Sequence, residues 1–125
     1  MLDLGRTFLQ AVERDPARLA IVDGSLRLSY QEWATHIGAL QQYFYSKGLA
    51  RGDRILTVLQ NRYEAATIHW VCQMAGIAIV PLNWRSKPEE IDYCAQNADV
   101  KLAFVEQISL KNYLDSETGK KIEVI

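Results

Sequence analysis

Residues 74–85 read MAGIAIVPLNWR. Gly76 suits the left-handed conformation that often ends a helix, because glycine has no Cβ to clash there. The apolar run Ile77–Val80 is short and unbroken, which is typical of a strand covered on both faces. The polar residues that follow, ending at Arg85, form a loop at the end of that strand, where ligands of α/β sheets usually bind. This stretch therefore predicts the end of a helix, a buried strand and a loop on the ligand-binding edge of a sheet.

The residues before this stretch begin the same alternation. The apolar run Ile55–Leu59 predicts another buried strand. Asn61 is placed to cap a helix over about residues 63–75, since its side chain can accept from a free N–H in the first turn. A strand, a helix and a second strand are thus expected in succession.

The residues after the stretch continue the alternation. A helix is expected to begin near Pro88, with the hydroxyl of Ser86 as its cap and acidic residues in its first turn. Leu102–Val105 predicts the next strand, residues 107–121 an irregular loop, and Ile122–Ile125 a last strand. Strands that alternate with helices predict right-handed βαβ units, so the expected class is α/β, with helices on both faces of a parallel sheet.

The N-terminal third predicts two helices separated by a hairpin. Apolar residues at helical spacing indicate a short helix over Leu4–Val12, and Leu19–Leu28 reads as a small β-hairpin that turns at an Asp-Gly pair. Ser29 and Glu32 have the spacing of a capping box, which opens a long amphipathic helix. Gly48 is placed to end it.

Composition limits the partners that the chain can have. Its 125 residues, of which 49% are hydrophobic, suffice for one globular domain over residues 1–125. A formal net charge of -1 gives no general attraction to nucleic acid or anionic lipid. The chain has neither a basic start followed by a long apolar run nor an apolar stretch of about 20 residues. We therefore expect no nucleic-acid partner, no membrane span and a cytoplasmic location.

The cysteine and histidine residues do not predict a metal or catalytic site. Cys72 and Cys94 are too far apart for a Cys-x-x-Cys pair, and both are expected to be buried free thiols. His36 and His69 lie within apolar helical patterns, where a lone histidine is usually a packing or surface residue.

Ordered motifs along the chain resemble the adenylate-forming superfamily, which includes acyl-CoA synthetases, luciferases and peptide-synthetase adenylation domains. LSYQE at residues 28–32 is similar to its Leu-Thr-Tyr-x-Glu-Leu motif, and AGIAIVPL at 75–82 to its Ala-Gly-x-x-x-Val-Pro-Leu motif. Between them, GLARGDRI at 48–55 matches Gly-Val-x-x-Gly-Asp-Arg-Val, and Asn61 the Asn before a helix. The resemblance runs from about Phe8 to Val105 and weakens in the tail. It identifies residues 1–125 as the N-terminal segment of an AMP-binding, acyl-CoA synthetase-like domain, of which they form the first subdomain.

The resemblance favours one branch of the superfamily. The Pro-Leu-Asn-x-Arg form at residues 81–85 is typical of carboxylate–CoA ligases, whereas amino-acid-activating domains more often carry an Asp there. In such ligases an acid and ATP give an acyl-adenylate and pyrophosphate, and the CoA thiol then displaces AMP to form a thioester. The implied cofactors of the whole enzyme are ATP, Mg and CoA, its substrate is a small carboxylic acid, and fatty acid metabolism is the implied setting.

The catalytic elements of the superfamily have no counterpart in these 125 residues. The Gly-, Ser- and Thr-rich phosphate loop, the acidic Mg-linked residue, the ribose-binding Asp and the C-terminal catalytic Lys are all absent from the sequence. We therefore expect this segment to contain no catalytic residue and no metal ligand, to bind no cofactor by itself and to be inactive alone.

Arg85 is the candidate cofactor-binding residue, because the corresponding Arg of similar CoA ligases lies near the path of the CoA nucleotide. A guanidinium suits phosphate oxygens. The competing interpretation is a surface Arg that braces the following helix. Asn83 and Trp84, in the same loop, are expected to shape it.

Other functions and partners remain open from sequence. The chain can be a fragment of an acid–CoA ligase, an independent small α/β binding module, or a structural subunit that complements another chain. A sheet taken from a larger domain leaves apolar faces and a strand edge uncovered. We therefore expect it to bind the remainder of the ligase or to self-associate, through strand edges or the helix faces around Trp33 and Trp70.

Overall fold

The computed structural model describes residues 3–125, which form two compact units. One contains the chain up to Arg51 together with Asn61–Ile77, and the other contains Gly52–Gln60 and Ala78–Ile125. We call the first the helical unit and the second the sheet unit.

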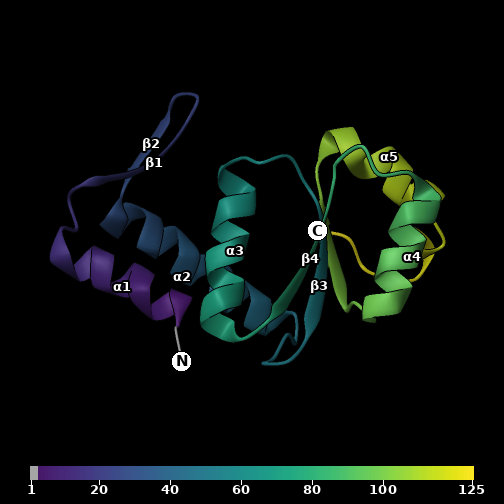
Figure 1. Cartoon of the computed structure of the whole chain (residues 1–125), viewed down its shortest axis with the longest axis horizontal. Coiled ribbons are helices and arrows are strands. Elements are labelled where there is room, and N and C mark those ends of the chain that lie inside the picture. The colour runs from purple at the N-terminus through teal and green to yellow at the C-terminus, as the bar shows by residue number, and fades with distance from the viewer. Residues whose placement is uncertain (1–2) are drawn as a thin grey trace. The chain divides into compact units, whose positions relative to one another are not determined.

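The helical unit consists of helices and a β-hairpin (Figure 1). Its elements are α1 (Leu4–Arg14), β1 (Leu19–Asp23), β2 (Leu26–Ser29), α2 (Tyr30–Ser46) and α3 (Tyr63–Ala75). β1 and β2 are antiparallel, and Gly24 between them has a φ of 58°, as the predicted hairpin requires. The predicted capping box opens α2: the Ser29 hydroxyl accepts from the Glu32 N–H at 3.1 Å, and the Glu32 carboxylate accepts from the Ser29 N–H at 2.9 Å.

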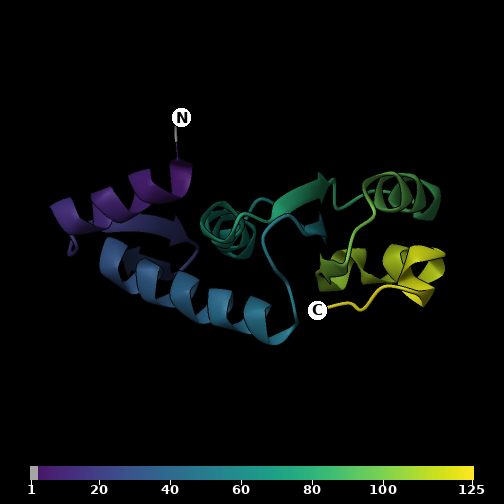
Figure 2. The same ribbon diagram turned by 90° about the horizontal axis from the view of Figure 1, so that it is seen from below.

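Aromatic residues from all the helices of this unit form its centre. The Phe8 ring of α1 lies 5.4 Å from Trp33 of α2 and 4.9 Å from Trp70 of α3, measured between ring centroids. The indole N–H of Trp33 donates to the Thr67 hydroxyl at 3.0 Å, so its polar atom is satisfied inside the core. Figure 2 shows α1 and α2 side by side.

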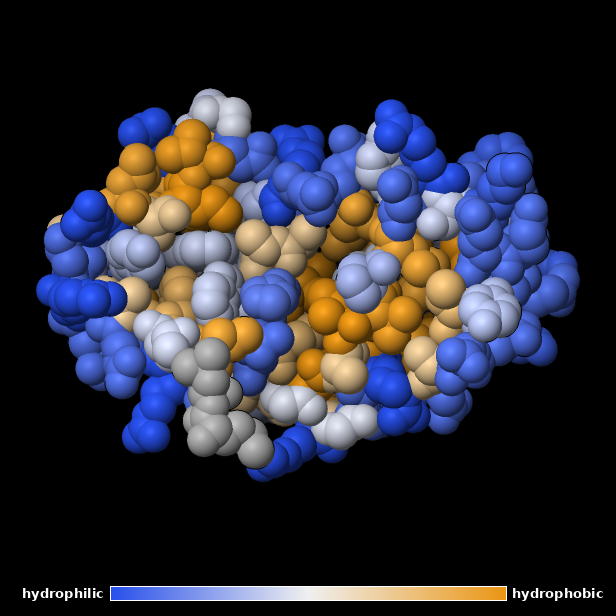
Figure 3. All heavy atoms as spheres, in the orientation of Figure 1, coloured by the Kyte–Doolittle hydropathy of each residue, from blue (hydrophilic) through white to orange (hydrophobic). Residues whose placement is uncertain are grey.

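Exposed apolar residues of the helical unit lie on the hairpin as well as on the helices α1 and α2. Trp33 is only 7% exposed and belongs to the core, so association through the helix faces around Trp33 and Trp70 stays a prediction. Leu19 and Val22 of β1 are 45% and 50% exposed, and apolar side chains gather at the hairpin (Figure 3). The apolar surface of this unit thus includes the strand β1.

The cap of α3 corrects a prediction. Asn61 was predicted to cap this helix, but the residue that precedes its first turn is Arg62, whose side chain makes no cap hydrogen bond. The carboxylate of Asp23, at the end of β1, accepts from the Tyr63 N–H at 2.9 Å and pairs with the Arg62 guanidinium at 3.3 Å. The hairpin therefore supplies the anion that the positive end of the helix dipole favours.

This cap predicts an acid-sensitive contribution to stability. The hydrogen bond from the Tyr63 backbone, followed by that from Arg62, holds the pKa of Asp23 below its ordinary value of 3.8. A lowered folded-state pKa stabilises the fold at neutral pH, and this contribution disappears as the pH falls through that pKa. Asp23→Asn keeps an acceptor but removes the charge. It should lower the midpoint of thermal unfolding at pH 7, and the difference from wild type should shrink toward pH 3.

Asp15→Asn is the matched control, because Asp15 is exposed in the same unit and its backbone makes its hydrogen bonds. A difference for Asp23→Asn that stays constant between pH 7 and pH 3 would contradict the assignment of the charge to the cap.

The sheet unit contains the parallel strands. Its elements are β3 (Arg54–Val58), β4 (Ala78–Leu82), α4 (Pro88–Ala98), β5 (Leu102–Val105), α5 (Gln107–Asp115) and the 3₁₀ turn η1 (Thr118–Lys120). The strand order is β4-β3-β5, and every pair is parallel. Ile55 of β3 lies opposite Ile79 and Leu102, so the strands start level and end at a common carboxyl edge.

The core of this unit lies between the sheet and its helices α4 and α5, which Figure 2 shows side by side. Its buried residues are Leu56, Val58, Ile91, Ala95, Val100, Ala103 and Tyr113. Alternate residues of β3 and β5 supply the sheet face, as the period of two requires. The structure confirms the α/β class, with a parallel sheet flanked by helices and a separate antiparallel hairpin.

The outer edge of β4 carries a proline. Within residues 3–125, β4 pairs only with β3. The Ala78 N–H donates to the Asp53 carbonyl at 2.9 Å, and alternation along the strand turns residue 79 and residue 81 the other way. Pro81 therefore stands where an outward N–H would be, a position in which proline costs the sheet no hydrogen bond.

The start of α4 also corrects a prediction. Ser86 was expected to cap the helix, but the cap position is Lys87, with Pro88 as the first helical residue. The Lys87 N–H is satisfied by the Glu90 carboxylate at 2.7 Å. Ser86 is buried instead, and its N–H donates to the Asn83 carbonyl at 2.9 Å, so it closes the preceding loop.

Residues 107–121 were predicted to be irregular, and that prediction is wrong. They hold α5 and η1. The misleading feature is a mixed pattern, because Ser109 is buried together with Tyr113 while Ile108 and Leu114 are 54% and 50% exposed. The buried serine is stable there because its hydroxyl donates to the Val58 carbonyl at 2.6 Å.

The last predicted strand, Ile122–Ile125, is shorter than expected. It forms one isolated parallel bridge, between Val124 and Ala103 of β5. The Ala103 N–H donates to the backbone carbonyl of Glu123 at 3.1 Å, and the Ile125 N–H donates to the backbone carbonyl of Ala103 at 2.9 Å. The C-terminal residues thus pair with the edge of β5 that β3 does not occupy, as a very short parallel segment.

Asp92 of α4 anchors the turn that leads to this row. Its carboxylate accepts from the Thr118 N–H at 2.8 Å, from the Thr118 hydroxyl at 2.6 Å and from the Glu117 N–H at 3.1 Å. Burial acts to raise the pKa of Asp92, but the hydrogen bonds from Thr118 and Glu117 outweigh it and lower the pKa. Gly119 follows in contact with the end of α5, where a Cβ would lie 2.1 Å from the Tyr113 carbonyl oxygen.

Candidate functional site

The carboxyl edge of the sheet unit brings together polar residues from three segments. Gln60 follows β3, Asn83 follows β4 and Glu106 follows β5. Because the strands are parallel and in register, these positions share one edge, the usual ligand edge of an α/β sheet.

The loop after β4 is held by two short hydrogen bonds of its own. The Asn83 side-chain oxygen accepts from the Arg85 N–H at 2.9 Å, and its carbonyl accepts from the Ser86 N–H at 2.9 Å. This is a side-chain-mediated turn of the kind that Asn favours. The prediction that Asn83 shapes this loop agrees with these contacts.

Arg85 lies on this loop with its guanidinium exposed. Its Cζ is 4.0 Å from the centroid of the Trp84 ring, and Trp84 is half-buried. Within residues 3–125 no carboxylate forms an ion pair with Arg85, unlike Arg54 with Asp99 and Arg62 with Asp23. The exposed guanidinium of Arg85 is therefore not paired with a carboxylate in this part of the chain.

The neighbouring acidic residue of this edge is already engaged. The Glu106 carboxylate accepts from the Gln60 backbone N–H and, at 3.4 Å, from its side-chain amide. The Glu106 N–H in turn donates to the Ser109 hydroxyl at 3.2 Å. This network ties β3 to the start of α5. The sequence analysis missed this network. Its signal in the sequence is Glu106, an acid at the end of a strand, three residues before Ser109.

Groups that could act as nucleophiles or bases lie elsewhere and are held in place. Burial raises the pKa of the Cys72 thiol to about 12 and that of the Tyr113 hydroxyl to about 12. The Tyr113 hydroxyl donates to the Ile122 carbonyl at 2.8 Å. His36 contacts the Tyr63 hydroxyl at 2.5 Å. Cys94 is only half-buried, so the prediction of two buried thiols holds for Cys72 alone.

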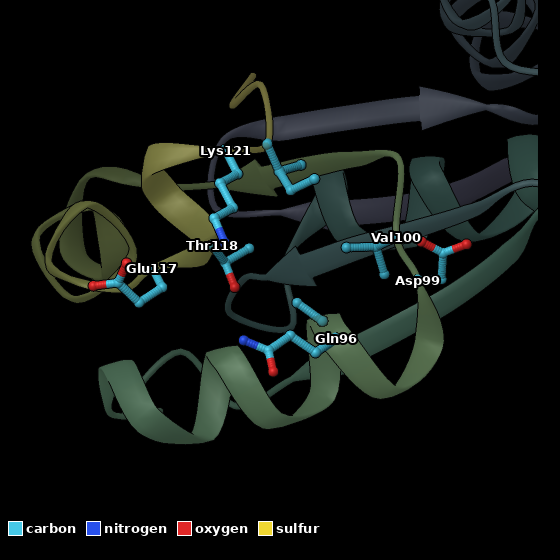
Figure 4. Close-up of a pocket in the computed structure, with 8 residues that line it drawn as sticks. Gln96, Asp99, Val100, Glu117, Thr118 and Lys121 are labelled. Carbon is cyan, nitrogen blue, oxygen red and sulfur yellow. The ribbon is translucent and has the colours of Figure 1, made fainter.

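Two shallow hollows are found on the sheet unit. One, of about 200 Å³, has Gln96 of α4 on one side and Thr118 and Lys121 on the other (Figure 4). Its lining residues also include Asp99 and Glu117, whose carboxylates pair with Arg54 and Lys120. The other, of about 400 Å³, is lined by Leu82, Ser86, Glu89, Glu90, Tyr93 and Cys94 and begins at the residues that flank the Asn83–Arg85 loop.

Neither a metal site nor a membrane span is found in the part of the chain that the structure describes. No group of His, Cys, Asp and Glu side chains there could hold a metal ion. No helix over those residues is long and apolar enough to cross a bilayer.

The fold and this edge define a segment of an α/β domain with polar residues at the carboxyl ends of its parallel strands. The chain belongs to the AMP-binding enzyme family, whose family model matches residues 8–125. The resemblance to adenylate-forming enzymes is thereby confirmed, and the match extends through the tail in which the motifs were weak. The chain corresponds to the N-terminal part of the adenylate-forming domain.

Relatives and solved structures agree with this placement. Protein Y of Streptomyces griseus is 30% identical over 90 residues, 72% of this chain and 29% of its own length. The 2-succinylbenzoate–CoA ligase of Bacillus licheniformis is 23% identical over 124 residues, 99% of this chain and 26% of its own length. The crystal structure of VinN matches with a TM-score of 0.88 at 24% identity, over 97% of this chain and 32% of VinN. The chain thus spans about a third or less of each of these proteins.

Proposed function

We propose that this chain is the N-terminal segment of an ATP-dependent carboxylic acid–CoA ligase. The observation that carries the proposal is the Asn83–Arg85 loop, which presents an exposed guanidinium without a carboxylate partner at the carboxyl edge of the sheet. The Pro-Leu-Asn-x-Arg sequence of this loop and the likeness to a CoA ligase support the choice of CoA as acceptor.

The reaction proposed for the whole enzyme has two steps. The carboxylate oxygen attacks the α-phosphorus of ATP and pyrophosphate leaves, which gives the acyl-adenylate. The CoA sulfur then attacks the acyl carbon, the thiol proton is released, and AMP leaves as the thioester forms. ATP and Mg supply the activation in the first step, and none of the residues described here is assigned to hold them.

Arg85 is assigned to the second step. A guanidinium with free in-plane N–H groups suits the phosphates of the CoA nucleotide, because two N–H groups can donate to one phosphate. The loop hydrogen bonds from Asn83 fix the backbone of Arg85, so the group is presented from a short, closed turn.

The first test of the proposal concerns the chain alone. The 125-residue chain is expected to show no ATP–pyrophosphate exchange with any carboxylic acid, because its sequence contains no phosphate loop and no catalytic Lys. The exchange of labelled pyrophosphate into ATP measures this directly, with the heat-denatured chain as the blank. Exchange above that blank would show that the segment activates acids without other residues.

A second test concerns Arg85 in the complete enzyme. Arg85→Ala is expected to raise the KM for CoA about tenfold, the effect of losing one charged hydrogen-bonded contact, with ATP–pyrophosphate exchange within about twofold of wild type. Arg27→Ala, which removes an exposed Arg of the hairpin, should change neither value. Equal losses in exchange and thioester formation would assign Arg85 to folding instead.

The partner that we propose for this segment is the remainder of the ligase, and self-association of the separate chain is the alternative outcome. Light scattering of the separate chain measures self-association. An independent binding module, by contrast, would be a stable monomer. A subunit that complements another polypeptide would associate with that chain alone. A small carboxylic acid as substrate, a role in fatty acid metabolism and a cytoplasmic location belong to the same proposal.

A further inference from the structure

Trp84 and Arg85 form a cation–π pair in the loop that follows β4. The guanidinium carbon lies 4.0 Å from the ring centroid, so the planar group is stacked against the indole face. An indole face attracts a cation because of its ring quadrupole, and Trp is the strongest of the aromatic side chains in this respect.

Stacking has a different consequence for Arg than an ion pair. The ion pairs of Arg54 with Asp99 and of Arg62 with Asp23 use guanidinium N–H groups, which donate to carboxylate oxygens at 3.2 and 3.3 Å. A ring face contacts the π surface of the guanidinium and uses none of its in-plane N–H donors. Arg85 is thus held while its donors stay available.

The anchor for this stack is the ring itself. Trp84 is half-buried, whereas Arg85 is exposed, so the ring is the more restrained partner. The Asn83 side chain fixes the Arg85 backbone at the same time, through the 2.9 Å hydrogen bond from its N–H. Backbone and side chain of Arg85 are therefore both restrained before any ligand arrives, which lowers the entropy lost on binding.

We infer that Trp84 is a positioning residue, which holds the Arg85 guanidinium with its N–H edge toward the incoming CoA nucleotide. This inference rests on the function proposed above. In this role Trp84 does not contact the substrate. Its effect is to be seen in the KM for CoA and to depend on the presence of Arg85.

The test compares Trp84→Leu and Trp84→Phe in the complete ligase, each alone and with Arg85→Ala. Trp84→Leu removes the ring and should raise the KM for CoA about threefold to tenfold, with exchange within about twofold of wild type. Trp84→Phe keeps a ring face and should stay within about twofold of wild type. In the Arg85→Ala background, Trp84→Leu should add less than twofold.

The outcomes separate this inference from the function on which it rests. If Arg85→Ala raises the KM for CoA and Trp84→Leu does not, the positioning role is wrong and the proposed function stands. If Arg85→Ala leaves that KM unchanged, the proposed contact of Arg85 with CoA is wrong. If Trp84→Leu raises the KM equally with and without Arg85, Trp84 acts by a route other than Arg85.

A spectroscopic measurement tests the stack without activity. In NMR spectra of the 125-residue chain, the indole ring current should shift the Arg85 side-chain protons upfield, and Trp84→Leu should abolish that shift. Unshifted Arg85 protons in a folded wild-type chain would overturn the inference.

Discussion

Gly119→Ala is expected to lower the free energy of unfolding by about 3 kcal/mol or more. The new Cβ would lie 2.1 Å from the Tyr113 carbonyl oxygen and 3.0 Å from the Leu114 Cα. Both are backbone atoms, so rotation of a side chain cannot relieve the overlap. The η1 turn must move away from the end of α5, and the hydrogen bonds of Thr118 with Asp92 must lengthen or break.

Gly38→Ala is the matched control and should change stability in the opposite direction. Gly38 lies in the interior of α2, and nothing is within 4 Å of its would-be Cβ. Replacement of glycine by alanine in an exposed helix interior gains about 0.5–1 kcal/mol. Urea unfolding followed by circular dichroism measures both variants. A Gly119→Ala variant as stable as wild type would show that the tail is not packed against α5 as described.

Ile91→Ala is expected to cost about 2–5 kcal/mol, the range for a large aliphatic side chain truncated in a packed core. Ile91 is wholly buried in the core of the sheet unit, on the face of α4 that meets the sheet. Its removal leaves a cavity among residues of β3, α4 and β5, which can close only in part.

Tyr93→Ala, on the same helix, should change the free energy of unfolding by less than about 0.5 kcal/mol, because Tyr93 is 72% exposed. Hydrogen exchange shows where the Ile91→Ala variant loses stability. The protection of backbone amides should fall first in β3 and β5. Equal destabilisation by the two substitutions would contradict the assigned orientation of α4.

Local signals in the sequence predicted the fold well. The Ser29–Glu32 capping box and the glycine ends of α2 and α3 depend on residues within a few positions of each other, and each is found as predicted. The cap of α3 could not be predicted in this way. Its acceptor, Asp23, is 40 residues from Tyr63, and only the folded hairpin brings the two together.

The prediction for residues 107–121 was wrong for a different physical reason. Helix α5 buries Ser109 together with Tyr113 and exposes Ile108, so its two faces do not separate cleanly into polar and apolar residues. The serine is tolerated because the Val58 carbonyl, at the end of β3, accepts its hydroxyl. No pattern within residues 107–121 contains that partner.

At the candidate site too, features set by neighbouring residues were predictable and features set by side-chain contacts or distant residues were not. The position of Arg85 at the carboxyl edge follows from the apolar run before it and was predicted. Its stacking on Trp84 is a matter of side-chain rotamers, and the bond between Gln60 and Glu106 spans 46 residues, so neither could be read from spacing.

The proline on the outer edge of β4 bears on how this sheet behaves in concentrated solution. A strand that arrives from another molecule would meet an outward N–H at Ile79 but none at Pro81. Growth of a cross-β assembly needs an unbroken row of donors and acceptors, and edge prolines are one means by which natural sheets interrupt that row. Recruitment of foreign strands, and amyloid-like polymerisation with it, is therefore expected to start at another edge than β4.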